Sequence, residues 1–118
     1  MKAATFADLT RLAVRFRDQR DWKQFHTPKE LAISLVVEAS ELLELMQWKQ
    51  GRSLAQTVRK KRRQITDELG DCIHSILLLA HDLGLDPAAA FTGKLRKLRR
   101  KYPVARCKGK ADKYTDLR

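Results

Sequence analysis

The 118-residue sequence predicts an all-α protein folded as an antiparallel four-helix bundle. Apolar residues recur at steps of three and four in four segments, as they do on one face of an α-helix. No stretch shows the sustained apolar and polar alternation of a half-buried strand. Because no internal repeat and no Gly/Ser-rich or Pro-rich linker divides the chain, we expect one domain over residues 1–118, with an irregular tail from about 104 to 118.

The first two predicted helices have clear sequence signals. The first covers roughly residues 5–20 and carries one apolar face. The second begins where Thr27 precedes Pro28, the order of a capping residue and a first helical position, and it runs to about Gln50, just before Gly51.

The other two predicted helices lie in the second half of the chain. The third begins in or after the basic run at residues 59–63 and continues to Gly84. Asp86 and Pro87 then read as the cap and first turn of a fourth helix, which stops near Tyr102.

The second and third predicted helices are apolar around most of their circumference, which is typical of helices buried on several sides. A chain this short has little interior of its own. We therefore expect identical subunits to complete the core, in a homodimer or a homotetramer made from dimers.

The net charge of +11 favours a polyanionic partner, because clustered Lys and Arg concentrate phosphates around them. Charge alone does not separate free nucleotides from nucleic acid, and a merely basic, solvated surface is the plainest alternative. The first sixteen residues contain no continuous apolar stretch for a secretory signal or membrane span, so we expect a cytoplasmic protein with no membrane partner. Cys72 and Cys107 are isolated, and we expect both to be free thiols.

Acidic residues interrupt the most apolar helices. Glu38 and Glu41 are three residues apart in the second helix, and Glu68 and Asp71 are three apart in the third. Each pair projects from one side of its helix, so two facing pairs form a cage of four carboxylates. Buried carboxylates without a partner are unfavourable, which points to a cation as the ligand.

Oxygen-only ligation suits Mg²⁺, with Mn²⁺ as an alternative, because such ions accept a few carboxylates and leave other positions to water and phosphates. Two further possibilities stay open for these acids. In the first, the acids are surface charges paired with Lys and Arg. In the second, His74 extends the second acidic pair into a di-iron site like those built from Glu-x-x-His. The first acidic pair has no such histidine, which favours a packed or supporting role for His74.

Short motifs occur in a fixed order along nearly the whole chain and resemble one family. They are FRD at 16–18, DWKQFH at 21–26, EASEL at 38–42, QW at 47–48, ELGD at 68–71, KYP at 101–103 and KYTDL at 113–117. This set resembles the MazG-like nucleoside triphosphate pyrophosphohydrolases, in their dCTP pyrophosphatase branch. The resemblance implies an all-α fold assembled as dimers or tetramers. It also implies cleavage of a (deoxy)nucleoside triphosphate, such as dCTP, between its α and β phosphates to give the monophosphate and pyrophosphate, in nucleotide-pool housecleaning.

The resemblance also assigns roles to individual residues. It makes Glu38, Glu41, Glu68 and Asp71 the metal ligands, and one of the glutamates, Glu41 or Glu68, would orient or deprotonate the attacking water. Substrate-binding positions of the family are matched by Trp22, His26 and Trp48 around the base and sugar, Lys94 and Lys101 along the phosphates, and Lys113 and Tyr114 in a tail segment over the nucleotide.

The sequence departs from the family pattern at two positions associated with holding the nucleotide. Ser75 stands where a tyrosine is frequent, and Leu98 stands where an asparagine is frequent. Loss of matched hydrogen bonds relaxes discrimination between bases, so dCTP, a modified cytosine triphosphate and a broader set of dNTPs all remain candidates.

Two functions of other classes also fit the sequence. The basic runs at 59–63 and 94–101 are dense enough for a helical nucleic-acid-binding module, which explains the charge but not the acids. A catalytically silent relative that only binds nucleotides or a partner fits the altered positions Ser75 and Leu98.

Overall fold

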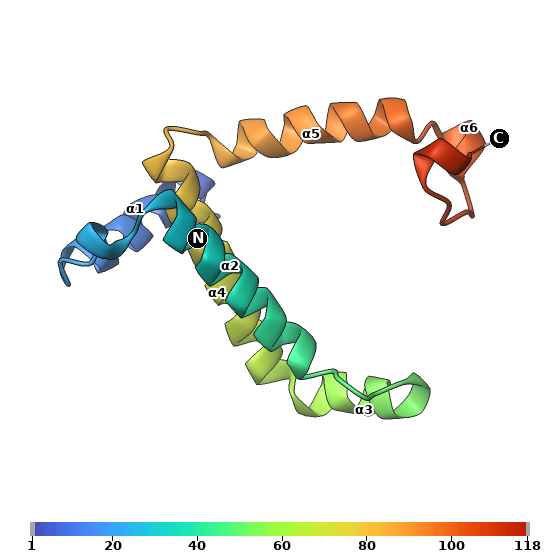
Figure 1. Cartoon of the computed structure of the whole chain (residues 1–118), viewed down its shortest axis with the longest axis horizontal. Helices are drawn as coiled ribbons and strands as arrows, with labels where there is room; N and C mark the ends of the chain where they lie inside the picture. Colours follow the sequence, from blue (N-terminus) through green and yellow to red (C-terminus); the bar gives the residue numbers. More distant parts are fainter. Residues whose placement is uncertain (1, 118) are drawn as a thin grey trace. The chain divides into compact units, whose positions relative to one another are not determined.

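The computed structural model describes residues 2–117, and its regular structure is helical (Figure 1). No β-strand occurs in that range, which confirms the all-α prediction. The elements of the described chain are α1 Phe6–Asp18, a 3₁₀ turn Lys23–Phe25, α2 Pro28–Glu44, α3 Gly51–Lys60, α4 Arg62–Asp82, α5 Pro87–Lys101, α6 Val104–Cys107 and a 3₁₀ turn Tyr114–Asp116.

The chain divides into two compact units, one ending at Gly84 and one beginning at Leu85. The first unit holds α1 to α4, and the second holds α5, α6 and the last 3₁₀ turn. The fold is described within each unit separately. The single domain and the four-helix bundle, which would need both units, therefore stay predictions. The tail from about residue 104, which we expected to be irregular, contains the short helix α6 and the second 3₁₀ turn. Neither was predicted, because so few residues show little periodicity.

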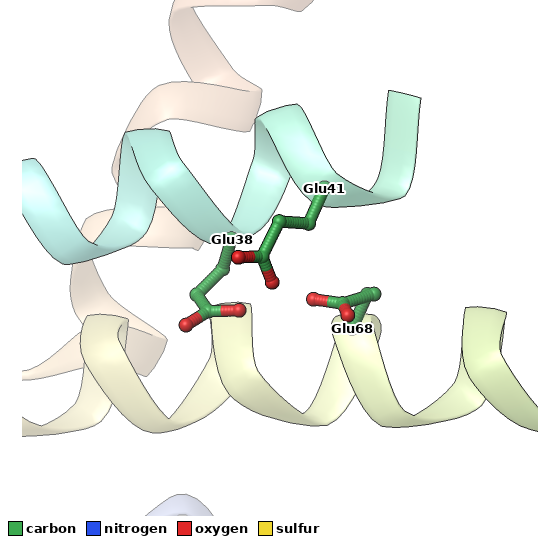
Figure 2. A group of neighbouring side chains, drawn as sticks. All are labelled: Glu38, Glu41 and Glu68. Atoms are coloured by element: carbon green, nitrogen blue, oxygen red, sulfur yellow. The ribbon is translucent and has the colours of Figure 1, made fainter. Parts of the chain in front are cut away.

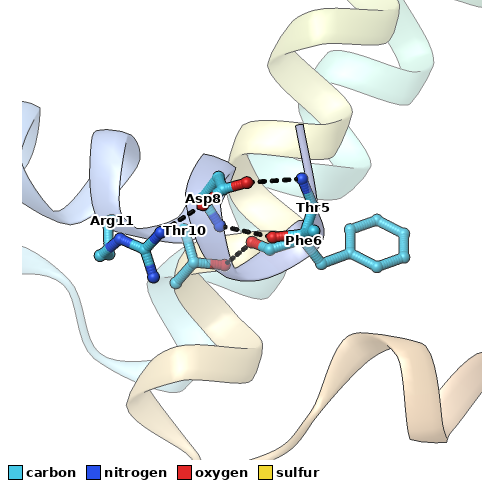
Figure 3. Close-up of polar contacts among 5 residues, drawn as sticks. All are labelled: Thr5, Phe6, Asp8, Thr10 and Arg11. Carbon is cyan, nitrogen blue, oxygen red and sulfur yellow. Dashed lines mark hydrogen bonds and ion pairs between the residues drawn. The ribbon is translucent and has the colours of Figure 1, made fainter. Parts of the chain in front are cut away.

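Side-chain caps set the starts of three helices, and two of the capping residues, Thr27 and Asp86, were predicted. The backbone N–H of Asp8 donates to the Thr5 hydroxyl at 3.1 Å, while the Asp8 carboxylate accepts from the Thr5 N–H at 2.9 Å and pairs with Arg11 (Figure 3). Thr27 caps α2 and Asp86 caps α5 in a similar way. These caps satisfy N–H groups that have no partner inside the helix.

Helices α2 and α4 lie side by side and run antiparallel, and they form the framework of the first unit (Figure 1). Their buried contact is small, with Leu31 of α2 and Leu77 and Leu78 of α4 as the fully buried apolar residues of the described chain. Helix α1 packs against α4 as well. This framework brings residues that are far apart in the sequence, such as Glu38 and Glu68, close together.

The predicted end of the second helix was wrong. Helix α2 ends at Glu44, and the chain turns through Trp48, whose φ of 67° is in the left-handed region that breaks a helix. Residues 51–60, most of which fall between the second and third predicted helices and were assigned no structure, form α3. Gly51, interpreted as a stop, begins this helix, and the Gln50 N–H donates to the Ser53 hydroxyl at 3.1 Å just before it.

The all-round burial expected for these helices does not occur within one chain. Val36 is 65% exposed and Leu43 is 69% exposed on α2, and Leu69, Ile73 and Ile76 of α4 are exposed too. Helical geometry places Ile33, Val36 and Leu43 opposite the face that packs on α4. The first unit therefore has an apolar surface that its own helices do not cover.

None of the helices between residues 2 and 117 combines the length and apolarity needed to cross a membrane. Cys72 and Cys107 are free thiols, as expected.

Candidate functional site

Three glutamates from the two antiparallel helices converge between them. Glu38 and Glu41 of α2 point toward Glu68 of α4, and one carboxylate oxygen from each lies within 4.8 Å of the other two (Figure 2). The three-residue spacing on α2 puts both side chains on the side that faces α4. The predicted facing of the two acidic motifs is thus observed for these three residues.

The cluster contains polar atoms that lack a partner. Glu38 and Glu68 are half-buried, and each has one buried carboxylate oxygen, Oε2, without a hydrogen bond to any described residue. Glu41 is exposed. Buried oxygens of this kind are unfavourable unless a donor or a cation satisfies them.

Two glutamates of the cluster have raised pKa values. Burial, followed by the neighbouring carboxyl groups of Glu68 and Glu41, raises the pKa of Glu38 to about 7. Burial is also the main cause that raises the pKa of Glu68. Both shifts mean that the ionised forms are disfavoured where they stand, and a bound cation would reverse that preference. The donor set of hard oxygens therefore fits a divalent ion such as Mg²⁺ or Mn²⁺.

Asp71, the fourth predicted ligand, is exposed and does not belong to the group of three oxygens. It is close enough for its charge to raise the pKa of Glu38 further. Asp71 and Glu38 also line the same cavity, so the fourth acid stands beside the cluster.

This cavity has a volume of about 240 Å³ and lies in the first unit. Flat and apolar side chains from α1, α2, α4 and the α1–α2 connection form its walls, which are Phe16, Trp22, Leu31 and Leu78. Its polar lining consists of Arg17, His26, Ser34, His74 and Ser75, in addition to the two acids. A cavity that combines aromatic and apolar walls with convergent polar groups, beside an acidic cluster, is a reasonable place for a small molecule.

Two of the predicted base-pocket residues lie in this cavity, and one does not. Trp22 and His26 are in its lining, and burial is the first cause that lowers the pKa of His26, which favours a neutral imidazole. Trp48 is 90% exposed in the turn after α2 and is not in the lining. Its role in binding a base stays a prediction.

The remaining predicted substrate-binding residues belong to the second unit. Lys101 Nζ lies 4.6 Å from the centre of the Tyr114 ring, and the Tyr114 N–H donates to the Tyr102 hydroxyl at 3.3 Å. Lys94 and Lys113 are exposed. The roles of Lys94, Lys101, Lys113 and Tyr114 stay predictions.

Sequence reasoning assigned no role to Arg17, which the structure places in the cavity lining. Its guanidinium pairs with Asp82, which is 65 positions away, so no local sequence pattern predicted this position of Arg17. His74, expected to be packed or supporting, makes an edge-on contact with the Phe16 ring at 5.9 Å and lines the cavity. It is not in the group of candidate metal ligands.

Several known proteins are similar to this chain. Residues 33–117 match the model of a family described as MazG-like. The chain is 38% identical to rat dCTP pyrophosphatase 1 over 115 residues and 36% identical to the human protein of the same name over 120 residues, covering 96% of this chain and 68% of each relative. The crystal structure of a pyrophosphatase from Archaeoglobus fulgidus superposes with a TM-score of 0.80 at 31% identity, over 87% of this chain and 96% of that one.

Proposed function

This chain belongs to the MazG-like family, and from that membership we propose that it is a nucleoside triphosphate pyrophosphohydrolase. The reaction releases a nucleoside monophosphate and pyrophosphate. The observation that carries the proposal is the cluster of Glu38, Glu41 and Glu68 beside a cavity with aromatic walls. Together they provide a place for a cation with phosphates and a place for a flat base.

Glu38, Glu41 and Glu68 would hold Mg²⁺, with Asp71 as the fourth ligand and Mn²⁺ as an alternative ion. The unpaired buried oxygens of Glu38 and Glu68 support this assignment. When bound there, a divalent cation would offset the charge of phosphate oxygens and polarise the phosphorus.

The glutamates also act on the attacking water. A carboxylate within hydrogen-bond reach of a water can orient it and accept its proton. Glu41 and Glu68 are the candidates for this role, and Glu41 is the more exposed of the two. Burial raises the pKa of Glu38 to about 7, so a cation that binds there would displace its proton.

Trp22 and His26 bind the base and sugar in this proposal. The indole is a flat apolar wall on which a base can stack, and the neutral imidazole offers one donor and one acceptor. Lys94 and Lys101 would contact the phosphates, while Trp48, Lys113 and Tyr114 would complete the nucleotide site. The relatives named dCTP pyrophosphatase make dCTP the first substrate to consider, with related dNTPs beside it.

We further propose that the chain works as a homodimer or homotetramer. The uncovered apolar residues of α2 and α4 form a surface of the kind that monomers rarely leave in water. Packing this surface against a second copy would place four long helices, two from each subunit, around one shared core.

The test is pyrophosphate release from standard and modified dNTPs and NTPs in the presence of Mg²⁺. We expect turnover by the natural protein and its loss in the double variant Glu38→Gln/Glu68→Gln. Glu44→Gln is the matched control, because Glu44 is an exposed acid on the same helix outside the cluster. If no triphosphate is hydrolysed, or if the double variant is as active as the control, the proposal is wrong.

A further inference from the structure

Arg20 does not line the candidate cavity, but it contacts two of the aromatic residues that do. The central carbon of its guanidinium is 3.7 Å from the centre of the Phe16 ring and 5.9 Å from that of the Trp22 ring. The same guanidinium donates from Nη1 to the Phe16 backbone oxygen at 2.9 Å. Phe16 and Trp22 are both in the lining of the cavity. Because a cation is attracted to an aromatic face, Arg20 restrains a wall residue without entering the cavity.

The Phe16 ring connects Arg20 to the rest of the aromatic wall. It meets the Trp22 ring edge-on, with ring centres 5.8 Å apart and ring planes at 73°. It also meets the His74 ring edge-on, at 5.9 Å and 84°. Edge-on contacts depend on the orientation of both rings, so a turn of the Phe16 ring would disturb both of them.

Packing alone does not fix the Phe16 ring. Phe16 is 41% exposed, and it also lines a second cavity of about 330 Å³, most of whose other lining residues are apolar, such as Leu9 and Leu77. A ring with apolar space beside it has room for more than one orientation. The stacked guanidinium, tied to the backbone of the same residue, favours the orientation in which Phe16 meets Trp22.

The backbone of Trp22 is fixed by the turn after α1. Asp21 has a φ of 53°, in the left-handed region, and the Gln24 side-chain amide donates to its backbone oxygen and to its carboxylate, both at 3.0 Å. The Trp22 N–H donates to the Arg17 backbone oxygen at 3.2 Å. These bonds set where the Trp22 side chain begins. Trp22 is 44% exposed, so its indole needs the edge-on contact with Phe16 to keep one orientation.

We propose that Arg20 is a positioning residue for nucleotide binding, which stacks on Phe16 and thereby holds the Trp22 indole at the cavity wall. The inference rests on the proposed function, which makes Trp22 a base-binding residue. In this arrangement the base contacts Trp22 and not Arg20. Arg20 therefore contributes to binding of the nucleotide, and not to the chemical step that the proposed function assigns to the acidic cluster.

The variant Arg20→Lys separates stacking from charge. Lysine keeps the positive charge but lacks the planar guanidinium that covers a ring and reaches a backbone oxygen at the same time. If Arg20 merely attracted phosphates by its charge, Arg20→Lys would bind the nucleotide as the natural protein does. Arg15→Lys is the matched control, because Arg15 is an exposed arginine of α1 that stacks on no ring among residues 2–117. Since Arg20 is exposed as well, both variants should fold, which circular dichroism checks.

The kinetic test uses the triphosphate that the natural protein hydrolyses fastest. We expect Arg20→Lys to raise KM by roughly 3- to 10-fold, the equivalent of about one cation–π contact or one aromatic pair. Its kcat should stay within about twofold, as when binding alone is weakened, and Arg15→Lys should change neither value by more than about twofold. An unchanged KM for Arg20→Lys, or a loss that falls on kcat, overturns the inference and leaves the proposed hydrolase intact.

A measurement without substrate keeps the two proposals separable. The sequence has two tryptophans, so Trp48→Phe leaves Trp22 as the only one. Trp48 is 90% exposed, and its replacement therefore removes little packing. In this background the fluorescence anisotropy of Trp22 should decay with the slow tumbling of the whole protein. Arg20→Lys should add a fast component, because unrestrained side chains move within nanoseconds, and Arg15→Lys should add none.

The anisotropy decides the positioning whether or not the protein is a hydrolase. If no triphosphate is hydrolysed but Arg20→Lys releases Trp22, the hydrolase proposal fails and the positioning of Trp22 by Arg20 stands. If the decay of Trp22 is the same with Arg20, Arg20→Lys and Arg15→Lys, the inference is overturned, and activity of the natural protein still supports the hydrolase.

Discussion

The carboxylate of Asp82 accepts a hydrogen bond from each terminal nitrogen of the Arg17 guanidinium, at 2.7 and 2.8 Å, and so ties α1 to the last residue of α4. The ion pair is buried, with side-chain exposures of 1% and 9%. Arg17 lines the same cavity as Trp22 and His26, so the pair holds one of the cavity's lining residues in place.

Removal of Asp82 should destabilise the protein strongly. Asp82→Ala leaves the buried guanidinium of Arg17 without its counter-charge, and breaking one side of a buried pair costs about 3–5 kcal/mol. Urea unfolding measures the loss. Asp67→Ala, which removes an exposed acid from the same helix, should change the free energy of unfolding by less than about 0.5 kcal/mol. Equal effects of the two substitutions would mean that the ion pair adds no more to the free energy of unfolding than an exposed acid does.

The stabilisation by Asp82 should depend on pH. The hydrogen bonds from Arg17 are the largest cause that holds the pKa of Asp82 below its ordinary value. A carboxyl group with a lowered pKa stabilises the folded state above its unfolded pKa of about 3.9, and this contribution is lost as the pH falls through the folded pKa. The difference in unfolding free energy between the natural protein and Asp82→Asn should therefore be constant near pH 6 and shrink below about pH 4. A difference that grows in acid would contradict the assignment.

The sequence predicts the helices well where side-chain caps mark them. Thr5, Thr27 and Asp86 each stand at the predicted start of a helix, because a capping side chain and the helix it caps are neighbours in the sequence. The turn at Trp48 was missed because its left-handed φ belongs to a bulky residue for which nothing local predicts it. Helix α3 was missed for a related reason, since Gly51 occurs at helix ends far more often than at their starts.

Some features of the candidate site were likewise predictable from the sequence, and others were not. The convergence of Glu38, Glu41 and Glu68 was predictable because helical periodicity fixes the face on which each acid lies. The role of Arg17 was not predictable, because its partner Asp82 is 65 positions away and only the packing of α1 on α4 brings them together.

Mg²⁺ should stabilise the protein through the acidic cluster. In the absence of metal, burial disfavours the ionised forms of Glu38 and Glu68, so Glu38→Gln should raise the melting temperature by a few degrees. With millimolar Mg²⁺ the natural protein should gain stability and Glu38→Gln should gain much less, because ligand binding stabilises only a fold that holds the ligand. Thermal melts with and without Mg²⁺ measure both effects. Glu44→Gln should respond as the natural protein does, and an equal response of all three proteins would rule out the cluster as the metal site.

The exposed apolar side of α2 should hold the subunits together. Val36 and Leu43 are 65% and 69% exposed in one chain, and they lie on the side of α2 that faces away from α4. In an oligomer that buries this side, Val36→Lys/Leu43→Lys would place two charges in an apolar interface, which is strongly unfavourable. Light scattering after size exclusion should show a dimer or tetramer for the natural protein and a smaller species, or unfolded protein by circular dichroism, for the variant. Glu30→Lys adds a lysine in the exposed first turn of the same helix and should leave the molecular mass unchanged. A natural protein with the mass of one 13.6 kDa chain, or a folded double variant with the natural mass, would show that subunits do not meet through this side of α2.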